Sequence, residues 1–288
     1  MGANIKAIRA RIRSVDSTRH ITKAMELVAS SKIRKAGARM EQSRFYRQVM
    51  LDAFAGLSAE KSRYARQRAR NLPTLYIVVA GDRGLAGGYN NNIFRSAATM
   101  LRENDLVMPV GKRAVDYYRH HGAILTDAFP SAENFTSAEA ARAAYRIKEL
   151  YDGERIGSVI LISTKFNSML SQSPQMTYLL PLEGLAEQQA EAGDAAKTAS
   201  SGTFGALTEY EPSAEEVLDA LIPEYLAGVL FTSVCEAYAS ELAARRSAMD
   251  TATKNADEML DSLSLTYNRA RQGAITQEIT EIVAGANA

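Results

Sequence analysis

The chain has almost no cysteine and no long apolar run. Cys235 is the single cysteine among 288 residues, so an intrachain disulfide is impossible. Its apolar neighbours indicate a small buried side chain rather than a reactive thiol. The sequence does not open on a signal-peptide core, and nowhere do about 18 uninterrupted apolar residues occur, as a membrane-spanning helix requires. We therefore expect a protein that is soluble or attached only peripherally to a membrane.

Residue types that commonly carry out chemistry are also scarce. The histidines are His20, His120 and His121, and none has a second ligand at metal-binding spacing. Motifs of serine hydrolases, zinc proteases and paired-cysteine metal sites are absent. We expect no catalytic residue, no metal ligand and no cofactor-binding residue in this chain.

Glycine and proline are missing from a long stretch near each end. In residues 3–36, Ile5, Ile8, Ile12 and Val15 recur at steps of three and four, which indicates a coiled-coil seam. After a change of phase near residue 17, the predicted seam continues through Ile21, Met25, Val28, Ile33, Ala36 and Met40 toward Phe45 and Val49.

The second stretch, residues 229–272, would be about 66 Å long as one helix. Its predicted seam consists of Leu260, Leu263, Tyr267, Ala270 and Ala274. Two such helices pair most simply as an antiparallel coiled coil, although two helices of an ordinary bundle remain an alternative.

The middle of the chain has the pattern of a small βαβ sheet. Short apolar runs typical of buried parallel strands occupy residues 74–81, 105–111 and 158–164, and residues 176–182 could add a strand. Amphipathic patterns between them predict helices at residues 90–103, 112–121 and 137–151.

The fold class is therefore α/β, with a Rossmann-like βαβ domain inserted between long N- and C-terminal helices that form an antiparallel coiled coil. We expect an N-terminal helix in residues 1–72, the α/β domain in 73–206 and a C-terminal helix in 207–288. Residues 186–206 are small, polar and without pattern, which predicts a flexible loop at the end of the α/β domain.

A glycine-rich segment follows the first predicted strand. Gly81, Gly84, Gly87 and Gly88 stand between a strand and a helix, which is where many proteins bind phosphate. Their spacing matches neither the dinucleotide fingerprint nor the P-loop, and no lysine follows to meet a phosphate. The segment could bind nucleotide, or it could form tight turns with close backbone packing.

Charge and hydrophobicity at the two ends point to protein partners. Residues 1–70 hold 17 Lys or Arg against five Asp or Glu, which could attract nucleic acid, an anionic membrane or an acidic protein. No nucleic-acid motif accompanies them, so we expect no nucleic-acid partner. At the other end, Ile275, Ile279, Ile282 and Val283 form an apolar stripe that a partner protein would cover.

Three segments together resemble the signatures of the gamma-subunit family of F-type ATP synthase. They are HITKAMELVASSKIRKA at residues 20–36, GDRGLAGGYNNN at 81–92 and LTYNRARQGAITQEITEIVAGA at 265–286. The resemblance implies a central-stalk rotor that couples ion-driven c-ring rotation to ATP synthesis or hydrolysis in a ring of alpha and beta subunits. It also implies an epsilon partner and a peripheral position on the cytoplasmic side of a bacterial cell membrane.

The resemblance assigns contacts to individual residues. The residues that match segments facing the alpha/beta ring are Thr22, Lys23, Met25, Ala86, Arg271, Gln272, Thr276, Glu278, Ile279 and Val283. Tyr210 and Glu211 match the foot that meets the c-ring. Two departures stand out: Ala86 replaces a frequent cysteine, and Asp250 and Lys254 exchange the order of charges that many relatives have.

The resemblance also favours tight turns over nucleotide binding at the glycine segment, because the family's nucleotides are on alpha and beta. Two alternative functions remain in view. A nucleotide-binding α/β protein would need a phosphate-loop lysine or an acidic ribose ligand, and neither has a convincing position. A coiled-coil adaptor for nucleic acid would bind with steep salt dependence.

Overall fold

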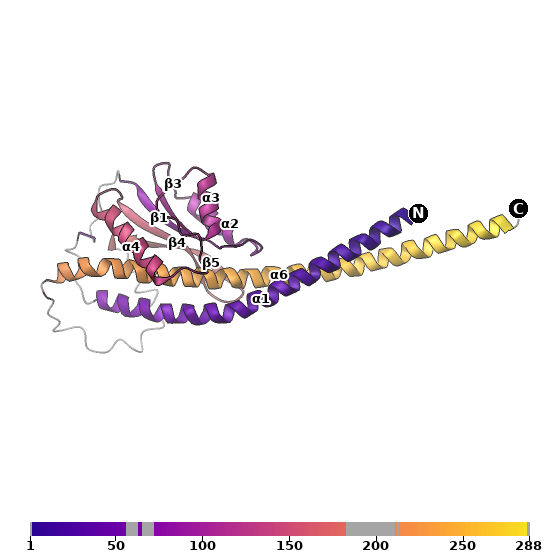
Figure 1. Cartoon of the computed structure of the whole chain (residues 1–288), viewed down its shortest axis with the longest axis horizontal. Coiled ribbons are helices and arrows are strands. Elements are labelled where there is room, and N and C mark those ends of the chain that lie inside the picture. Colours follow the sequence, from indigo (N-terminus) through magenta and orange to yellow (C-terminus); the bar gives the residue numbers. More distant parts are fainter. Residues whose placement is uncertain (1, 56–62, 65–71, 183–210, 212, 287–288) are drawn as a thin grey trace. The chain divides into compact units, whose positions relative to one another are not determined.

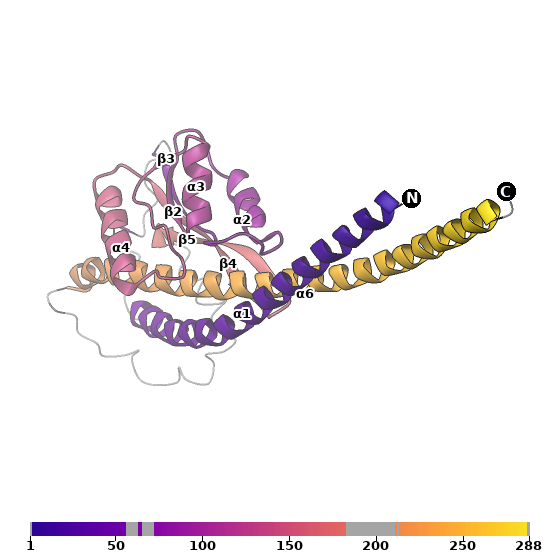
Figure 2. The ribbon, with the colours of Figure 1, turned by 45° about the vertical axis from the view of Figure 1, so that its right-hand side comes forward.

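The computed structural model describes residues 2–55, 63–64, 72–182, 211 and 213–286. The chain forms two compact units, which we name by their contents. The helical unit comprises residues 1–31 and 245–288, and the sheet unit comprises residues 32–244. Both long helices, α1 (Gly2–Ala55) and α6 (Ala214–Ala286), contribute residues to each unit (Figures 1 and 2).

The sheet unit contains one five-stranded sheet in the order β3-β2-β1-β4-β5. All pairs are parallel except β4 with β5, which is antiparallel. The strands are β1 (Thr74–Val79), β2 (Leu106–Val110), β3 (Ile124–Leu125), β4 (Ser158–Phe166) and β5 (Gln172–Leu180). The shorter helices are α2 (Tyr89–Ala98), α3 (Lys112–His120) and α4 (Ser137–Asp152).

Helices cover both faces of the sheet. Successive residues of a strand point to opposite faces, so each strand contributes side chains to two cores. On β1, Leu75, Ile77 and Val79 join the core formed with α4 and the first part of α6. Tyr76 and Val78 join a second core, formed with α2 and α3. Figure 1 shows these helix pairs on different sides of the sheet. The continuous apolar run of β1 therefore reflects a strand buried on both faces.

The first part of α6 is a core helix of the sheet unit. It contains an apolar window long enough to cross a membrane by length and composition, but 56% of that window is buried within the structure. Residues Leu226, Val229 and Leu230 are among those packed into the core behind the sheet. Cys235 is buried as well, which confirms the prediction for it, and burial raises the pKa of its thiol.

Within the sheet unit, α1 packs closely against α6. The Thr232 hydroxyl donates to the Ser43 carbonyl at 2.9 Å, and Arg44 pairs with Glu236 at 2.7 Å. Gly228 permits this approach, because a Cβ at that position would lie 2.9 Å from the Tyr46 ring. The contact between α1 and α6 therefore depends on the absence of a side chain at Gly228 and on the polar bonds of Thr232 and Arg44.

The helical unit is an antiparallel pair. Arg9 bonds to Tyr267, Arg19 pairs with Asp257 at 3.3 Å, and the hydroxyls of Thr22 and Thr253 are 2.8 Å apart. Partners on α6 move toward the N-terminus as residues on α1 move toward the C-terminus. The antiparallel coiled coil predicted from the terminal heptads is confirmed for this unit.

The predicted change of phase near residue 17 is wrong. Ile21 and Val28 are each 57% exposed, whereas Thr22 and Ala29 are buried. The seam residues of α1 are Ile5, Ile8, Ile12, Val15, Arg19, Thr22, Glu26 and Ala29, at unbroken steps of three and four. Polar side chains at three of these positions concealed the repeat. On α6 the five predicted seam residues from Leu260 to Ala274 are all partly buried, as expected.

The structure confirms some of the other predictions made from the sequence and corrects others. The mixed α/β fold, three parallel strands and three intervening helices are confirmed. The short strand β3 was missed, and Phe45 and Val49, expected in the α1 seam, are exposed. The proposed loop at 186–206 lies outside the described residues, and the domain limits remain predictions.

Candidate functional site

The glycine segment, residues 81–88, forms a loop at the carboxyl end of β1. We call these residues the glycine loop. Gly81 donates its N–H to the Asn90 side chain at 2.9 Å and accepts at its carbonyl from the Arg113 N–H at 3.1 Å. Leu85 and Gly87 have φ values of 61° and 58°, so the chain turns twice through the left-handed region. The glycines therefore serve tight turns, and the adjoining backbone groups are bonded within the fold.

A carboxylate from α6 occupies the mouth of this loop. The Glu241 side chain is 1% exposed and accepts from the N–H groups of Asp82 at 3.4 Å and Arg83 at 3.3 Å. A Cβ at Gly81 would lie 2.6 Å from the Glu241 Cδ, so glycine is required for the approach. Backbone N–H groups of this kind are what a phosphate would use in a nucleotide-binding protein.

Asp82 is a second internal anion at the same edge of the sheet. Its carboxylate accepts from the Lys112 N–H at 3.2 Å, at the start of α3. It also accepts from the Ser131 hydroxyl and from the N–H groups of Ala132 and Glu133, at 2.8–3.0 Å. The first turn of α3 and the loop at residues 131–133 therefore have an anion supplied by the chain itself.

Polar contacts also join both long helices to the strand ends and loops at this edge of the sheet. On α6, the Tyr89 hydroxyl donates to the Ala237 carbonyl at 2.8 Å, and Glu236 accepts from the Phe166 N–H at 3.1 Å. On α1, Lys32 pairs with Glu133 at 2.5 Å, and this hydrogen bond lowers the pKa of Glu133. We call these contacts, together with that of Glu241 to the glycine loop, the clasp.

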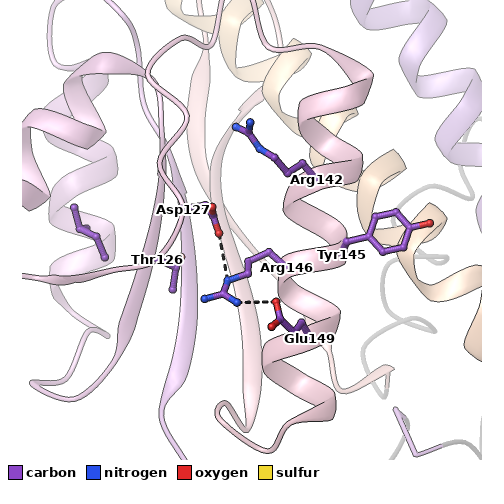
Figure 3. A pocket seen from close by; sticks show the side chains of 7 residues that line it. Thr126, Asp127, Arg142, Tyr145, Arg146 and Glu149 are labelled. Carbon is purple, nitrogen blue, oxygen red and sulfur yellow. Dashed lines mark hydrogen bonds and ion pairs between the residues drawn. The ribbon is translucent and has the colours of Figure 1, made fainter.

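The described part of the sheet unit has depressions beside α4 and beside the glycine loop. The depression in Figure 3, of about 590 Å³, lies beside α4 and is lined by Leu125 and by polar residues such as Asp127, Arg142 and Glu149. Its two carboxylates, Asp127 and Glu149, both pair with Arg146, at 3.4 and 2.6 Å. Another depression, of about 450 Å³, lies between the glycine loop and α3. Among the described residues, no group of three or more His, Cys, Asp or Glu could hold a metal ion.

The predicted ring-contact residues of α1 lie in the helical unit. Thr22 is buried in the seam, Met25 is partly buried, and Lys23 is exposed. Lys23 bonds to Glu26 at 2.8 Å, and this hydrogen bond raises the pKa of Lys23. Opposite them on α6, Asp250 pairs with Lys254 at 2.8 Å along one helix face. Of the three predicted contacts on α1, only Lys23 has an exposed side chain.

The predicted contacts near the end of α6 share one property, which is exposure. The exposed residues are Arg271, Gln272, Thr276, Glu278, Ile279 and Val283, together with Ile275 and Ile282 of the apolar stripe. None of residues 275–285 is buried. This part of α6 therefore presents a bare apolar stripe, flanked by polar side chains.

Other predicted contacts fall elsewhere. Ala86 is buried, with 3% of its surface exposed, whereas the neighbouring Leu85 is 63% exposed. Glu211 is exposed, and Tyr210 lies outside the described residues. Sequence reasoning missed Glu236 and Glu241. A signal was present, because they are the only charged residues between Val229 and Ala244, in a run of otherwise apolar or small side chains.

Comparison with known proteins gives the same family along nearly the whole chain. A family model described as ATP synthase matches residues 4–288. The ATP synthase gamma chain of Ruminococcus albus is 41% identical over 290 residues, covering 97% of this chain and 96% of that relative. The ATP synthase gamma chain of Alkaliphilus metalliredigens is 40% identical over 294 residues, covering 100% of this chain and 99% of that relative.

A solved structure has the same fold at lower identity. It is a chain of the Euglena gracilis mitochondrial ATP synthase, in a structure of OSCP, F1 and c-ring in rotational state 3. The TM-score is 0.74 at 19% identity, and the match covers 100% of this chain and 95% of that chain. The order of the elements, a sheet inserted in the sequence between two long helices, therefore belongs to a fold shared at 19% sequence identity.

Proposed function

This chain belongs to the gamma-chain family of ATP synthase, and from this premise we propose that it is the central-stalk rotor subunit of an F-type enzyme. It would couple ion-driven rotation of a c-ring to ATP synthesis or hydrolysis in the alpha/beta ring. The observation that carries the proposal is the antiparallel helix pair with its bare apolar stripe beyond Ala274. A rod of this kind suits a sleeve formed by other subunits.

The proposed partners follow from the surfaces. The alpha and beta subunits would surround the helical unit through the seam residue Thr22, its neighbours Lys23 and Met25, and the exposed residues from Arg271 onward. Tyr210 and Glu211 would meet the c-ring, and epsilon would join the same foot. The chain would then be peripheral to the cytoplasmic side of a bacterial cell membrane, without a nucleic-acid partner.

The subunit would have no catalytic site and would bind no nucleotide itself. Glu241 and Asp82 support this, because their carboxylates accept bonds from backbone N–H groups at the carboxyl edge of the sheet. The contribution to catalysis would be mechanical. An asymmetric rod contacts three catalytic subunits differently and so stabilises a different nucleotide affinity in each.

Cross-linking rotor to stator tests the rotor function. Leu85 is a better site than Ala86, because its side chain is exposed in the glycine loop. In a Cys235→Ala background, Leu85→Cys would be oxidised against a cysteine placed in the facing loop of beta. We expect multisite ATP turnover to fall in proportion to the linked fraction and to recover on reduction, while nucleotide binding to beta persists.

The control is the same complex with only one of the two new cysteines. Full turnover by a completely cross-linked complex, verified on a non-reducing gel, would exclude rotation and leave the chain as a static scaffold.

A further inference from the structure

We infer that Glu241 is a positioning residue that transmits torque between α6 and the sheet, an inference that rests on the proposed rotor function. Its buried carboxylate bonds to two backbone N–H groups of the glycine loop. The loop follows β1, the central strand of the sheet. Force applied to α6 at this point therefore reaches the middle of the sheet through a short path of bonds.

Apolar packing and hydrogen bonds both oppose movement of α6 on the sheet. The first part of α6 is packed into the core behind the sheet by apolar side chains. These contacts hold the helix against the sheet, and turning the helix about its own axis would expose part of its apolar face. Hydrogen bonds are directional and also oppose that rotation.

The clasp supplies directional bonds at successive turns of α6. Ala237 and Glu241 are four residues apart, so they lie on the same face of the helix. Ala237 accepts from the Tyr89 hydroxyl at the end of the glycine loop, and Glu241 accepts from its beginning. The loop is thus bonded to α6 at both of its ends, across one helical turn.

Glu241 is the member whose loss the site can least accommodate. Without the carboxylate, the half-buried Asp82 and the exposed Arg83 would lose the acceptor of their N–H groups, and the space beside Gly81 would be empty. Gly81 has no side chain to fill it. The loop would then be free to move relative to α6 while the apolar core keeps the unit folded.

The test uses the assembled complex in inverted membrane vesicles carrying Glu241→Ala. ATP hydrolysis and ATP-driven ion uptake are measured together, uptake being followed with a pH-sensitive dye and with radioactive sodium. We expect the ratio of ion uptake to hydrolysis to fall at least threefold, with hydrolysis retained. Glu224→Ala is the matched control, because Glu224 is an exposed carboxylate on the same helix in the same unit.

A disulfide provides a test that does not depend on the folding of the alanine variant. A Cβ at Gly81 would lie 3.0 Å from the Glu241 Cγ, so Gly81→Cys with Glu241→Cys, in a Cys235→Ala background, brings two thiols together. The complex is assembled in the oxidised form. We expect nearly normal uptake per ATP while the bond is intact and at least a threefold lower ratio after reduction.

Two outcomes would overturn the inference. One is an unchanged ratio of uptake to hydrolysis in an assembled Glu241→Ala complex. The other is a double-cysteine complex whose ratio is the same before and after reduction. Failure of the proposed function would look different, because the wild-type chain itself would then not assemble with the alpha/beta ring and the c-ring or would not sustain ATP-driven uptake.

Discussion

A carboxylate that reaches a glycine loop from a neighbouring helix accepts the hydrogen bonds that a bound phosphate would accept. Unlike a phosphate, it cannot dissociate, because it is part of the chain. Glu241 has this position, and Asp82 has a similar one at the start of α3. A strand followed by glycines and a helix can therefore have its backbone N–H groups bonded to an acid of the same chain. What matters for phosphate binding is whether these backbone N–H groups already have an acceptor within the protein.

At the residue scale, we expect the isolated chain to bind no ATP, because an exchangeable phosphate would have to displace the buried Glu241 carboxylate. Equilibrium dialysis of the purified chain with labelled ATP and magnesium measures this. Isolated beta subunit is the positive control. Saturable, magnesium-dependent binding that Gly87→Asp abolishes would mean that the loop is a nucleotide site after all.

The ion pair of Lys32 with Glu133, which is part of the clasp, should make the stability of the sheet unit depend on pH in acid. The hydrogen bond from Lys32 holds the pKa of Glu133 below its ordinary value of about 4.5. A lowered pKa in the folded state means that the pair stabilises the fold above that ordinary value, and that this stability is lost as pH falls through the folded pKa. We therefore expect Lys32→Met to reduce the acid sensitivity of the sheet unit.

Thermal melts between pH 6 and pH 3 would show this as a smaller drop in melting temperature for the variant than for the wild-type chain. Arg34→Met, which changes an exposed cation on the same helix, is the control. Identical pH profiles for Lys32→Met and the wild-type chain would contradict the assignment.

At the scale of the element, the seam of α1 separates what sequence reasoning found from what it missed. Apolar heptads at Ile5–Val15 and Leu260–Ala274 were readable, because each seam position carries a hydrophobic or small side chain. Arg19, Thr22 and Glu26 occupy the same seam, and their polarity suggested a break that the helix does not have. A polar residue can be recognised as part of a seam only when the structure shows the helix that faces it.

The same reasoning explains the other omissions. Strand β3 is two residues long, and no alternation can be read in so short a segment. Glu241 was missed because its partners are backbone N–H groups 158 and 159 residues away in sequence. No local pattern indicates such a partner. The three parallel strands and their helices were readable because burial on both faces produces continuous apolar runs.

The polar seam should weaken the helix pair where it occurs. Thr22 and Thr253 bond across it at 2.8 Å. Replacing both with valine removes the two hydroxyls together and leaves an apolar contact of similar shape, which we expect to stabilise the pair by about 0.5–1 kcal/mol. Hydrogen exchange of residues 245–265 in the full chain should slow by roughly two- to fivefold.

Ser30→Val changes an exposed residue of α1 and serves as the control. Faster exchange in the double-valine variant would indicate that the hydroxyl pair holds the two helices together more strongly than an apolar contact can.

At the scale of the whole molecule, an apolar stripe near the end of α6 is among the exposed apolar surfaces of the described part of the chain. The stripe of Ile275, Ile279, Ile282 and Val283 is exposed along α6. The proposed sleeve of alpha and beta subunits would cover it. A carboxylate introduced there would be buried without a partner, which is costly.

We therefore expect Ile279→Glu with Val283→Glu to impair assembly or to loosen coupling, whereas Ile279→Leu should have little effect. ATP synthesis by membranes carrying each variant, with the amount of assembled complex measured by immunoblot, distinguishes them. Unchanged synthesis with the double glutamate variant would mean that this stripe is not enclosed.

The end of the seam at Ala274 also changes the cross-section of the rod. Two paired helices, each about 10–12 Å thick with axes 8–10 Å apart, make an oval about 20 Å by 11 Å. A single helix beyond the pair is nearly round. Turned inside a ring, an oval pushes different walls outward at different angles, as a cam does, whereas a round tip turns in place as a pivot does. The residue at which α6 leaves its partner is therefore the boundary between the part of the rod that can displace its surroundings and the part that can only centre it.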